Sequence, residues 1–421
     1  MSSSPRRSAS RSGGAHVSRA NPGRVAAARA LLATGEGAHL EDALAEVLPE
    51  EPRDRSLAWF LAFGTLRRRG HVDGALRPRL RQPLGGLDAE VAAVLRLGAY
   101  ERLFGRAKAH AVVHQWVEVA RAVGAGRASG LINAVLRRVE PVGLSEVEAL
   151  DHPAWLVSRW RRRYGAEAAD AWMQANGEAP PRFVVAPQGL PEGLEGTPAT
   201  LGEAPLPGVY RIEGDGPIPD LPGFEAGRFW VQDAAAVAVA DLVGAGEGMA
   251  VLDACAAPGG KSFRLASQGA EVVAVDRSPE RLQLVDDAAK RLGLAVRTVP
   301  HDWLDGPLPE VGAFAAVLVD APCTGLGTVR RHPEIRWRRQ PSDLPEAAQR
   351  QGRILQAAAT HVAPGGRLVY AVCSPEPEEG EAVVQAFLDA HSHFTAGPRL
   401  HTAPPQHGED AHAAFVLERA E

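Results

Sequence analysis

Cysteine is scarce in this chain of 421 residues, which contains only Cys255, Cys323 and Cys373. Three thiols cannot form a disulfide framework, and separations of 68 and 50 residues do not match the short spacing of a zinc knuckle. No stretch approaches the roughly 18 apolar residues of a membrane span, and the first residues lack the hydrophobic region of a signal peptide. We therefore expect a soluble protein of the reducing cytoplasm, with no bound metal and no membrane partner.

Lysine is equally scarce, since only Lys108, Lys261 and Lys290 stand among the 46 basic residues. Phosphate contacts must therefore come mostly from arginine. The net charge of −5 hides an asymmetry, because residues 1–150 carry 22 basic against 15 acidic residues while residues 151–421 carry 24 against 36. The positive first part favours contact with a polyanion.

The apolar pattern divides the chain into segments. Residues 1–21 are rich in serine, arginine and glycine without apolar periodicity, which predicts a disordered basic tail. Over residues 22–142, runs such as RVAAARALLAT and LINAVLRRVE repeat apolar residues at three- and four-residue spacing, which predicts an all-α bundle. A helical stretch over 152–176 and a Pro/Gly-rich region with runs such as RFVVAP predict a small α+β segment over 151–230.

From residue 231 to 421 the pattern of apolar residues predicts an α/β domain. The short apolar runs MAVLDA, EVVAVD, AFAAVLVD and GRLVYAV alternate with helical stretches. Such alternation is typical of buried parallel strands in a doubly wound, Rossmann-like fold. In DRSPERLQLVDDAAKRLG, Ser278 is suited to cap a helix, Pro279 to its first turn and Gly293 to its end.

A loop of small residues, DACAAPGGKS, follows the first predicted strand. Gly259 and Gly260 remove side chains that would block a close approach of the backbone to a ligand. The helix that we expect to begin near Ser262 presents an electropositive N-terminus to that ligand. A nucleoside triphosphate loop is excluded, because its first glycine would stand at Cys255.

Acidic residues end the next two predicted strands. Asp276 stands 23 residues after Asp253, the spacing at which a carboxylate accepts hydrogen bonds from a ribose diol. Asp302, in PHDWL, follows the third strand in a position suited to an adenine amino group. The pattern favours an adenosyl cofactor.

Two further strands each deliver a thiol. VLVDAPCTG places Asp320 at a strand end, then the stiffening Pro322, then Cys323, and GGRLVYAVCS places Cys373 after the next strand. A lone cysteine is usually only a small apolar residue. Two thiols at two strand ends, however, would face one cleft.

Two thiols beside a methyl donor suit the chemistry of cytosine. Carbon-5 of cytosine becomes nucleophilic only when a thiolate adds to carbon-6, and a second group must help to release the product. An acid has to stabilise ring nitrogen 3, for which Asp320 is the candidate. The residues alone leave open which of Cys323 and Cys373 attacks.

The motifs DACAAPGGK, DAPCTG followed by RRHPEIRW, and YAVCSPEPEEGE together resemble those of the RNA 5-methylcytosine methyltransferases of the Sun/Fmu class. The runs at 22–142 resemble the NusB-like RNA-binding bundle of the subgroup that methylates 16S ribosomal RNA. Segment 151–230 resembles the RNA-binding segment of the same enzymes. The resemblance implies that S-adenosylmethionine is held by Cys255, Ala256, Ala257, Pro258, Gly259, Gly260, Lys261, Asp276, Asp302 and Asp320.

The resemblance also implies roles for the thiols, with Cys373 as the nucleophile and Cys323 aiding release. The sequence departs from the family pattern at Val372 and at Gly380, which puts fine positioning in doubt. The implied substrate is 16S ribosomal RNA, naked or in an early assembly intermediate, and the expected state is a monomer.

Other functions stay open on the sequence. A related enzyme would methylate transfer RNA or another RNA, and a noncatalytic factor for ribosome assembly would keep the fold without the reaction. Methylation of DNA or of an exocyclic nitrogen is a further alternative, although nitrogen methylation needs no thiol. Arginines around Trp337 and in SRWRRRYG over 158–165 are candidates for phosphate contact and stacking.

Overall fold

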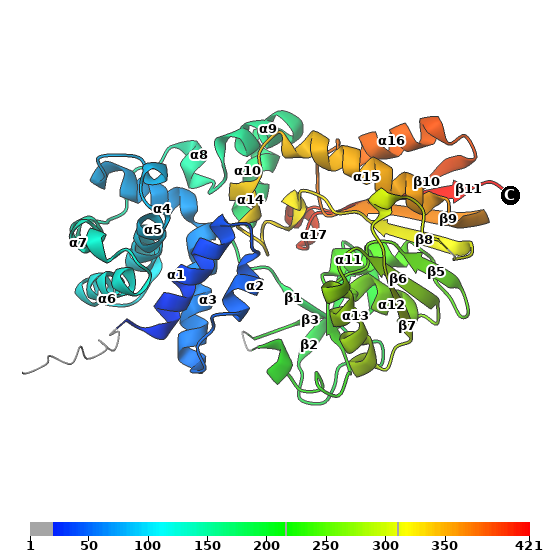
Figure 1. The fold of residues 1–421 in the computed structure, drawn as a ribbon, viewed down its shortest axis with the longest axis horizontal. Helices are drawn as coiled ribbons and strands as arrows, with labels where there is room; N and C mark the ends of the chain where they lie inside the picture. The colour runs from blue at the N-terminus through cyan, green and yellow to red at the C-terminus, as the bar shows by residue number, and fades with distance from the viewer. Residues whose placement is uncertain (1–19, 215–216, 310) are drawn as a thin grey trace, which may run out of the picture. The chain divides into compact units, whose positions relative to one another are not determined.

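The computed structural model describes residues 20–214, 217–309 and 311–421, so the predicted tail over 1–21 lies almost wholly outside the described residues. The chain divides into two compact units, residues 1–145 and 146–421 (Figure 1). Residues 151–230, predicted as a segment of their own, fall within the second unit. No helix in the described ranges combines the length and the apolarity needed to cross a membrane.

The described part of the first unit is helical. Its α-helices are α1 (Pro22–Gly35), α2 (Leu40–Ala45), α3 (Pro52–Arg67), α4 (Arg69–Leu76), α5 (Ala89–Phe104), α6 (Ala109–Ala122) and α7 (Ser129–Arg137). Short 3-10 turns are η1 (Arg77–Arg79), η2 (Leu84–Gly86) and η3 (Gly126–Ala128). The predicted all-α bundle is confirmed.

Helix α5 is the centre of this bundle, since it packs against α1, α3, α4, α6 and α7. A Cβ on Gly98 would lie 2.5 Å from a methyl carbon of Leu136, which explains how α7 approaches α5 so closely. Buried Glu101 accepts hydrogen bonds from Arg24 Nε at 2.9 Å and from Trp116 Nε1 at 2.8 Å. This polar group is thus satisfied and ties α1 and α6 to α5.

The second unit opens with helices α8 (Glu146–Ala149), α9 (Ala154–Tyr164) and α10 (Ala166–Ala175). The helical stretch predicted over 152–176 is present, but it consists of two helices, α9 and α10, and not of one. Gly165 lies at φ 83°, a left-handed conformation that ends one helix and allows the next to start in a new direction.

A four-stranded antiparallel sheet follows, in the order β2-β3-β1-β4. Its strands are β1 (Arg182–Val185), β2 (Gly196–Leu201), β3 (Ala204–Ile212) and β4 (Trp230–Val231), and a 3-10 turn, η4, spans Ile218–Asp220. The run RFVVAP, which contributed to the predicted α+β segment, contains β1, and the apolar run GVYRI forms the end of β3.

The larger sheet has seven strands in the order β10-β11-β9-β8-β5-β6-β7. Its strands are β5 (Ala250–Asp253), β6 (Glu271–Asp276), β7 (Val296–Pro300), β8 (Phe314–Asp320), β9 (Val362–Val372), β10 (Phe394–His401) and β11 (Ala413–Arg419). The helices and 3-10 turns between or before them are α11 (Ala234–Asp241), α12 (Gly260–Ser267), α13 (Pro279–Leu292), η5 (Trp303–Asp305), η6 (Leu326–Thr328), α14 (Ile335–Arg338), α15 (Asp343–Ala359), α16 (Glu381–Ala390) and α17 (Pro404–His407).

Strands β5 to β9 are parallel, as the alternating runs predict, and the Rossmann-like fold is confirmed. Strand β11 pairs antiparallel with β9, and β10 pairs antiparallel with β11; the sequence pattern did not single out either strand. In β10 all but two residues are exposed, so its sequence lacks the apolar run that marks the buried strands.

Local signals determine helix α13. The Ser278 side chain accepts a hydrogen bond from the Arg281 N–H at 3.2 Å, Pro279 stands in the first turn, and Gly293 ends the helix at φ 67°. The predicted caps are therefore confirmed.

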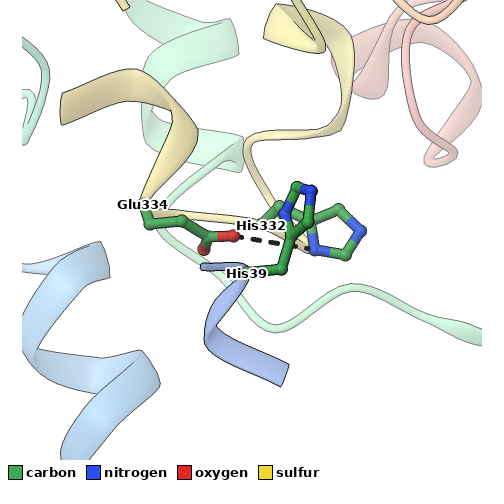
Figure 2. Close-up of side chains that lie close together, drawn as sticks. All are labelled: His39, His332 and Glu334. Atoms are coloured by element: carbon green, nitrogen blue, oxygen red, sulfur yellow. Dashed lines mark ion pairs between the residues drawn. The ribbon is translucent and has the colours of Figure 1, made fainter. Parts of the chain in front are cut away.

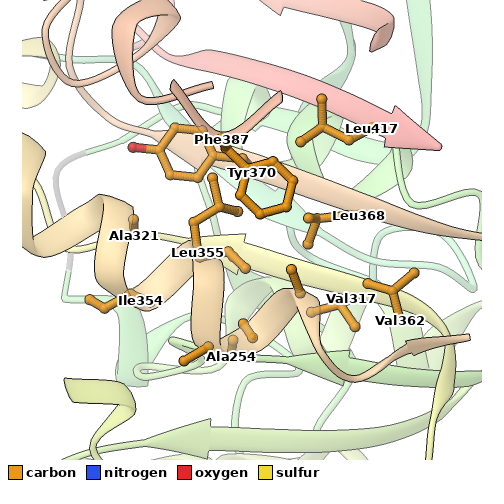
Figure 3. Packing of buried hydrophobic residues seen from close by; sticks show 14 of the residues in the cluster. Ala254, Val317, Ala321, Ile354, Leu355, Val362, Leu368, Tyr370, Phe387 and Leu417 are labelled. Atoms are coloured by element: carbon orange, nitrogen blue, oxygen red, sulfur yellow. The ribbon is translucent and has the colours of Figure 1, made fainter. Parts of the chain in front are cut away.

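Helices α15 and α16 cover one face of the sheet, as Figure 3 shows. Leu355 of α15 and Phe387 of α16 pack with Leu368 and Tyr370 of β9, all of them nearly or fully buried. This packing sets the position of β9 and therefore of the loop that follows it.

Candidate active site

The parallel strands bring the predicted site residues to one edge of the large sheet. Strand β5 ends at Asp253, β6 at Asp276 and β8 at Asp320. Asp302 follows β7, and Cys373 directly follows β9. Because these strands point the same way, all five residues lie at their carboxyl ends, where ligands bind in such sheets.

The loop between β5 and α12 depends on two glycines. Gly259 lies at φ 104°, and a Cβ there would lie 2.5 Å from Cζ of Phe263. A Cβ on Gly260 would lie 3.1 Å from Cδ of Gln232. Helix α12 begins at Gly260 and not near Ser262, so its N-terminus lies closer to the loop than the sequence indicated.

Asp276 connects this loop to helix α13. Its Oδ2 accepts the N–H of Ala257 at 3.2 Å, and its Oδ1 accepts the N–H of Ser278 at 3.0 Å. Asp302 caps η5, because its Oδ1 accepts the N–H of Leu304 at 2.9 Å. Each carboxylate oxygen accepts up to two hydrogen bonds, so these local bonds are compatible with a bound ligand.

The thiol of Cys255 lies among the carboxylates of the site. Burial raises its pKa well above the usual range, and the charges of Asp253, Asp320, Asp276 and Asp302 raise it further. A raised pKa favours the protonated thiol, which is a poorer nucleophile than the thiolate. The excess of negative charge at this edge suits a ligand that carries positive charge.

Lys261 provides positive charge beside Asp320, since its Nζ lies 2.5 Å from Oδ2 of that residue. Burial lowers the pKa of Lys261, but the attraction of Asp320, with smaller contributions from Asp253 and Cys373, leaves the pKa raised. The ammonium group is thus charged at neutral pH and pairs with the carboxylate of Asp320.

The two strand-end thiols meet. Sγ of Cys323 lies 3.2 Å from Sγ of Cys373, and both cysteines are free and partly exposed. The hydrogen bond to Cys373 and then burial raise the pKa of the Cys323 thiol well above its usual range. Either sulfur can be the donor in this contact.

The loop after Cys373 is held by helix α9. Arg159 Nε lies 2.5 Å from Oε2 of Glu376, and Trp160 Nε1 donates to Oε1 of the same residue at 2.8 Å. Arg161 pairs with Asp170 at 2.7 Å. Within the SRWRRRYG cluster, considered above for RNA contact, Arg159 and Trp160 therefore support the active-site loop, while Arg161 joins α9 to α10.

The arginines around Trp337 need a similar correction. Arg336 is fully buried and donates to the carbonyls of Val329 at 2.6 Å and Asn176 at 2.9 Å. Arg331 pairs with Asp233 at 2.5 Å and with Asp410 at 2.7 Å.

In the same segment, Nδ1 of His332 lies 4.0 Å from Oε1 of Glu334 (Figure 2).

Because the guanidinium groups of Arg331 and Arg336 pair with carboxylates and carbonyls of the protein, these two arginines bind protein groups rather than phosphate. Their partners stand 70 residues or more away in the chain in all cases but one.

Sequence reasoning did not single out Glu379, which lies fully buried between the two thiol loops. Its carboxylate accepts hydrogen bonds from both loops. The available signal was the pair of glutamates that stands five and six residues after a candidate catalytic cysteine, in SPEPEEGE.

Both units match known families. Residues 242–414 match the family described as 16S rRNA methyltransferase RsmB/F, and residues 21–141 match the NusB family.

The chain is also similar to individual proteins over most of its length. Ribosomal RNA small subunit methyltransferase B of Thermus thermophilus is 41% identical over 383 residues, which are 90% of each chain. The protein of the same name from Escherichia coli O139:H28 is 37% identical over 360 residues, which cover 80% of this chain and 82% of that one. The crystal structure of PH0851 has a TM-score of 0.81 at 22% identity, covering 96% of this chain and 100% of that chain, and agrees in fold.

Proposed function

Because this chain belongs to the 16S rRNA methyltransferase RsmB/F family, we propose that it methylates carbon-5 of a cytosine in 16S ribosomal RNA through a covalent cysteine adduct. The observation that supports this chemistry most directly is the pair of free thiols 3.2 Å apart, at the ends of neighbouring strands. Methylation of an exocyclic nitrogen would use neither thiol.

The chain is an S-adenosylmethionine-dependent methyltransferase, and the strand-end residues fit that cofactor. When bound, S-adenosylmethionine supplies a methyl group on a positively charged sulfur. The carboxylates around Cys255 favour such a charge, and Asp276 stands where it can accept hydrogen bonds from ribose hydroxyls. The residues that would hold the cofactor are Cys255, Ala256, Ala257, Pro258, Gly259, Gly260, Lys261, Asp276, Asp302 and Asp320.

In the proposed reaction, the Cys373 thiolate forms a bond to carbon-6 of cytosine, and the ring electrons are pushed toward carbon-5. Asp320 lies 2.5 Å from Lys261 at the same strand-end edge, and this pair supplies the proton that ring nitrogen 3 takes up as the thiolate adds to carbon-6.

After methyl transfer, the proton on carbon-5 must leave before the sulfur–carbon bond breaks and returns the thiolate to Cys373. Cys323 is the group positioned to aid this release, because its Sγ lies 3.2 Å from the attacking sulfur. In this role the Cys323 thiolate accepts the carbon-5 proton, and the electrons of the broken C–H bond re-form the ring double bond as the bond from carbon-6 to the Cys373 sulfur breaks. The raised pKa of Cys323 makes its thiolate a strong base.

The bundle supports a role in RNA binding. A groove of about 620 Å³ between α6 and α7 is lined by Arg102, Arg121 and Arg137, together with His110 and His114. Arginine side chains of this kind pair with phosphates. We infer that the bundle recruits 16S RNA, naked or in an early assembly intermediate, to a monomeric enzyme of the cytoplasm, where a reducing environment keeps the two thiols free.

Loss of the gene is expected to leave one cytosine of 16S RNA unmethylated. Bisulfite sequencing of ribosomal RNA from a deletion strain measures this directly, and a plasmid copy of the wild-type gene should restore the modification. An unchanged 16S pattern together with a lost signal in transfer RNA would identify the alternative substrate. An unchanged pattern in all RNA would overturn the proposed methylation of cytosine carbon-5.

Replacing Asp276 by alanine is expected to weaken S-adenosylmethionine binding about 10- to 100-fold, since hydrogen bonds to a charged group contribute about 1.5–3 kcal/mol. Titration calorimetry measures the effect. The exposed Asp287 on α13, which accepts a hydrogen bond from Gln283 at 3.0 Å, provides the control variant Asp287→Ala. Equal affinity of the Asp276 and Asp287 variants would remove Asp276 from the cofactor site.

A further inference from the structure

Each of the two thiols is followed directly by a hydroxyl residue, Thr324 after Cys323 and Ser374 after Cys373. Both hydroxyls donate to the same carboxylate oxygen, Oε2 of Glu379, each at 2.5 Å. The two hydroxyl oxygens lie 3.4 Å apart. One carboxylate therefore joins the residues that immediately follow both reactive cysteines.

The other oxygen of Glu379 holds the same region. Oε1 accepts the backbone N–H of Thr324 at 2.7 Å and Nε2 of Gln351, on α15, at 3.0 Å. The same amide nitrogen of Gln351 lies 3.2 Å from the carbonyl oxygen of Pro322, directly before Cys323. The Cys323 loop is thus bound on both sides of the thiol.

A carboxyl group at this place needs hydrogen-bond partners, because it is removed from water. Glu379 is fully buried, and its four hydrogen bonds come from neutral groups. Burying a carboxylate is costly unless it is fully hydrogen-bonded, and an apolar residue would fill the space at lower cost. A multiply bonded carboxylate, in contrast, defines the positions of its donors.

We propose that Glu379 is a positioning residue that sets the separation of the Cys323 and Cys373 thiols. It touches neither reacting sulfur and acts through Thr324 and Ser374. The inference rests on the proposed function, in which one thiol attacks carbon-6 and the other aids release at the same ring. A misplacement of about 1 Å is enough to cost such a site about 100-fold in rate.

Two substitutions separate geometry from charge. Glu379→Ala removes all four acceptor contacts. Glu379→Gln keeps them satisfied, because its oxygen can accept from Thr324 N–H and Gln351 while its amide donates to the two hydroxyl oxygens. The matched control is Glu378→Ala, since Glu378 is 41% exposed and pairs with Arg159 at 2.6 Å.

The separation of the thiols can be measured without RNA. Dibromobimane alkylates two nearby thiols, each displacing one bromide, and mass spectrometry of the digested protein identifies the Cys323–Cys373 bridge. With the full-length protein, we expect bridging in Glu379→Ala to fall about tenfold, as the effective concentration of one thiol near the other drops. Glu379→Gln and Glu378→Ala should bridge as the wild type does.

Activity supplies the second readout. For Glu379→Ala we expect kcat to fall about 100-fold with S-adenosylmethionine affinity unchanged, and for Glu379→Gln we expect most of kcat to return. A general loss of structure would lower cofactor binding as well. If Glu379→Ala does not fold, Thr324→Val combined with Ser374→Ala removes only the two hydroxyls and should reduce bridging and kcat in the same direction.

The outcomes separate this inference from the proposed function. Wild-type bridging and wild-type kcat in Glu379→Ala, or in the double hydroxyl variant when that is the folded one, would overturn the positioning role. A wild-type protein that fails to methylate cytosine would overturn the proposed function, while loss of bridging in Glu379→Ala would still support the positioning role.

Discussion

Cys373→Ala is expected to abolish methylation, with a loss of at least about 10⁴-fold, because the attacking sulfur is gone and nothing replaces the bond to carbon-6. It should also abolish covalent trapping by RNA that contains 5-fluorocytosine, whose fluorine cannot leave as a proton does. S-adenosylmethionine binding should be unaffected. Denaturing gel electrophoresis of labelled RNA reports the covalent complex.

Cys323→Ala is the matched variant, since its sulfur lies 3.2 Å from that of Cys373. It should still form the adduct and accumulate it with ordinary RNA, because release is impaired. The opposite result, trapping by Cys373→Ala but not by Cys323→Ala, would reverse the two roles. Trapping by neither variant would mean that both thiols are needed for attack.

Asp320→Asn is expected to lower kcat about 100- to 1,000-fold, the usual effect of losing one electrostatic contact to the reacting group. The variant keeps the size of the side chain but weakens the 2.5 Å contact with Lys261 and the stabilisation of ring nitrogen 3. Single-turnover methylation with saturating cofactor measures the chemical step. The overall fold should persist, because Asp320 is partly exposed at a strand end.

The control for this experiment is Asp389→Asn, on the exposed side of α16, where Asp389 accepts a hydrogen bond from Gln385 at 2.8 Å. It should leave the rate unchanged. An Asp320→Asn enzyme with a normal single-turnover rate and weakened cofactor binding would assign Asp320 to the cofactor alone.

Local sequence signals were sufficient to predict features that depend only on residues close together in the chain, such as helix caps and strand ends. Ser278 and Gly293 mark the ends of α13 because capping depends on residues within one turn. Asp276 and Asp320 stand at strand ends, since short apolar runs define buried parallel strands and the next polar residue lies at their edge. The edge of the sheet at which the site lies could therefore be predicted from the order of the strands and the spacing of the acidic residues in the sequence.

Contacts between residues that are far apart in the sequence could not be predicted in this way. Arg336 looked like a phosphate ligand beside an aromatic ring, yet its guanidinium reaches the carbonyl of Asn176, which stands 160 residues away. Arg159 similarly reaches Glu376 across 217 residues. A charged side chain carries no local signal of its partner, because burial of that side chain depends on which distant backbone groups the fold brings near.

The sequence by itself determined the set of reactive groups at one edge of the sheet, namely Asp320, Cys323 and Cys373 after parallel strands, because strand direction alone collects them there. It left the distance between the thiols undetermined. Only the tertiary structure decided that Cys323 and Cys373 lie 3.2 Å apart, with Glu379 bonded to both loops. The physical reason is that loop conformation depends on hydrogen bonds between segments about 50 residues apart, which no periodicity encodes.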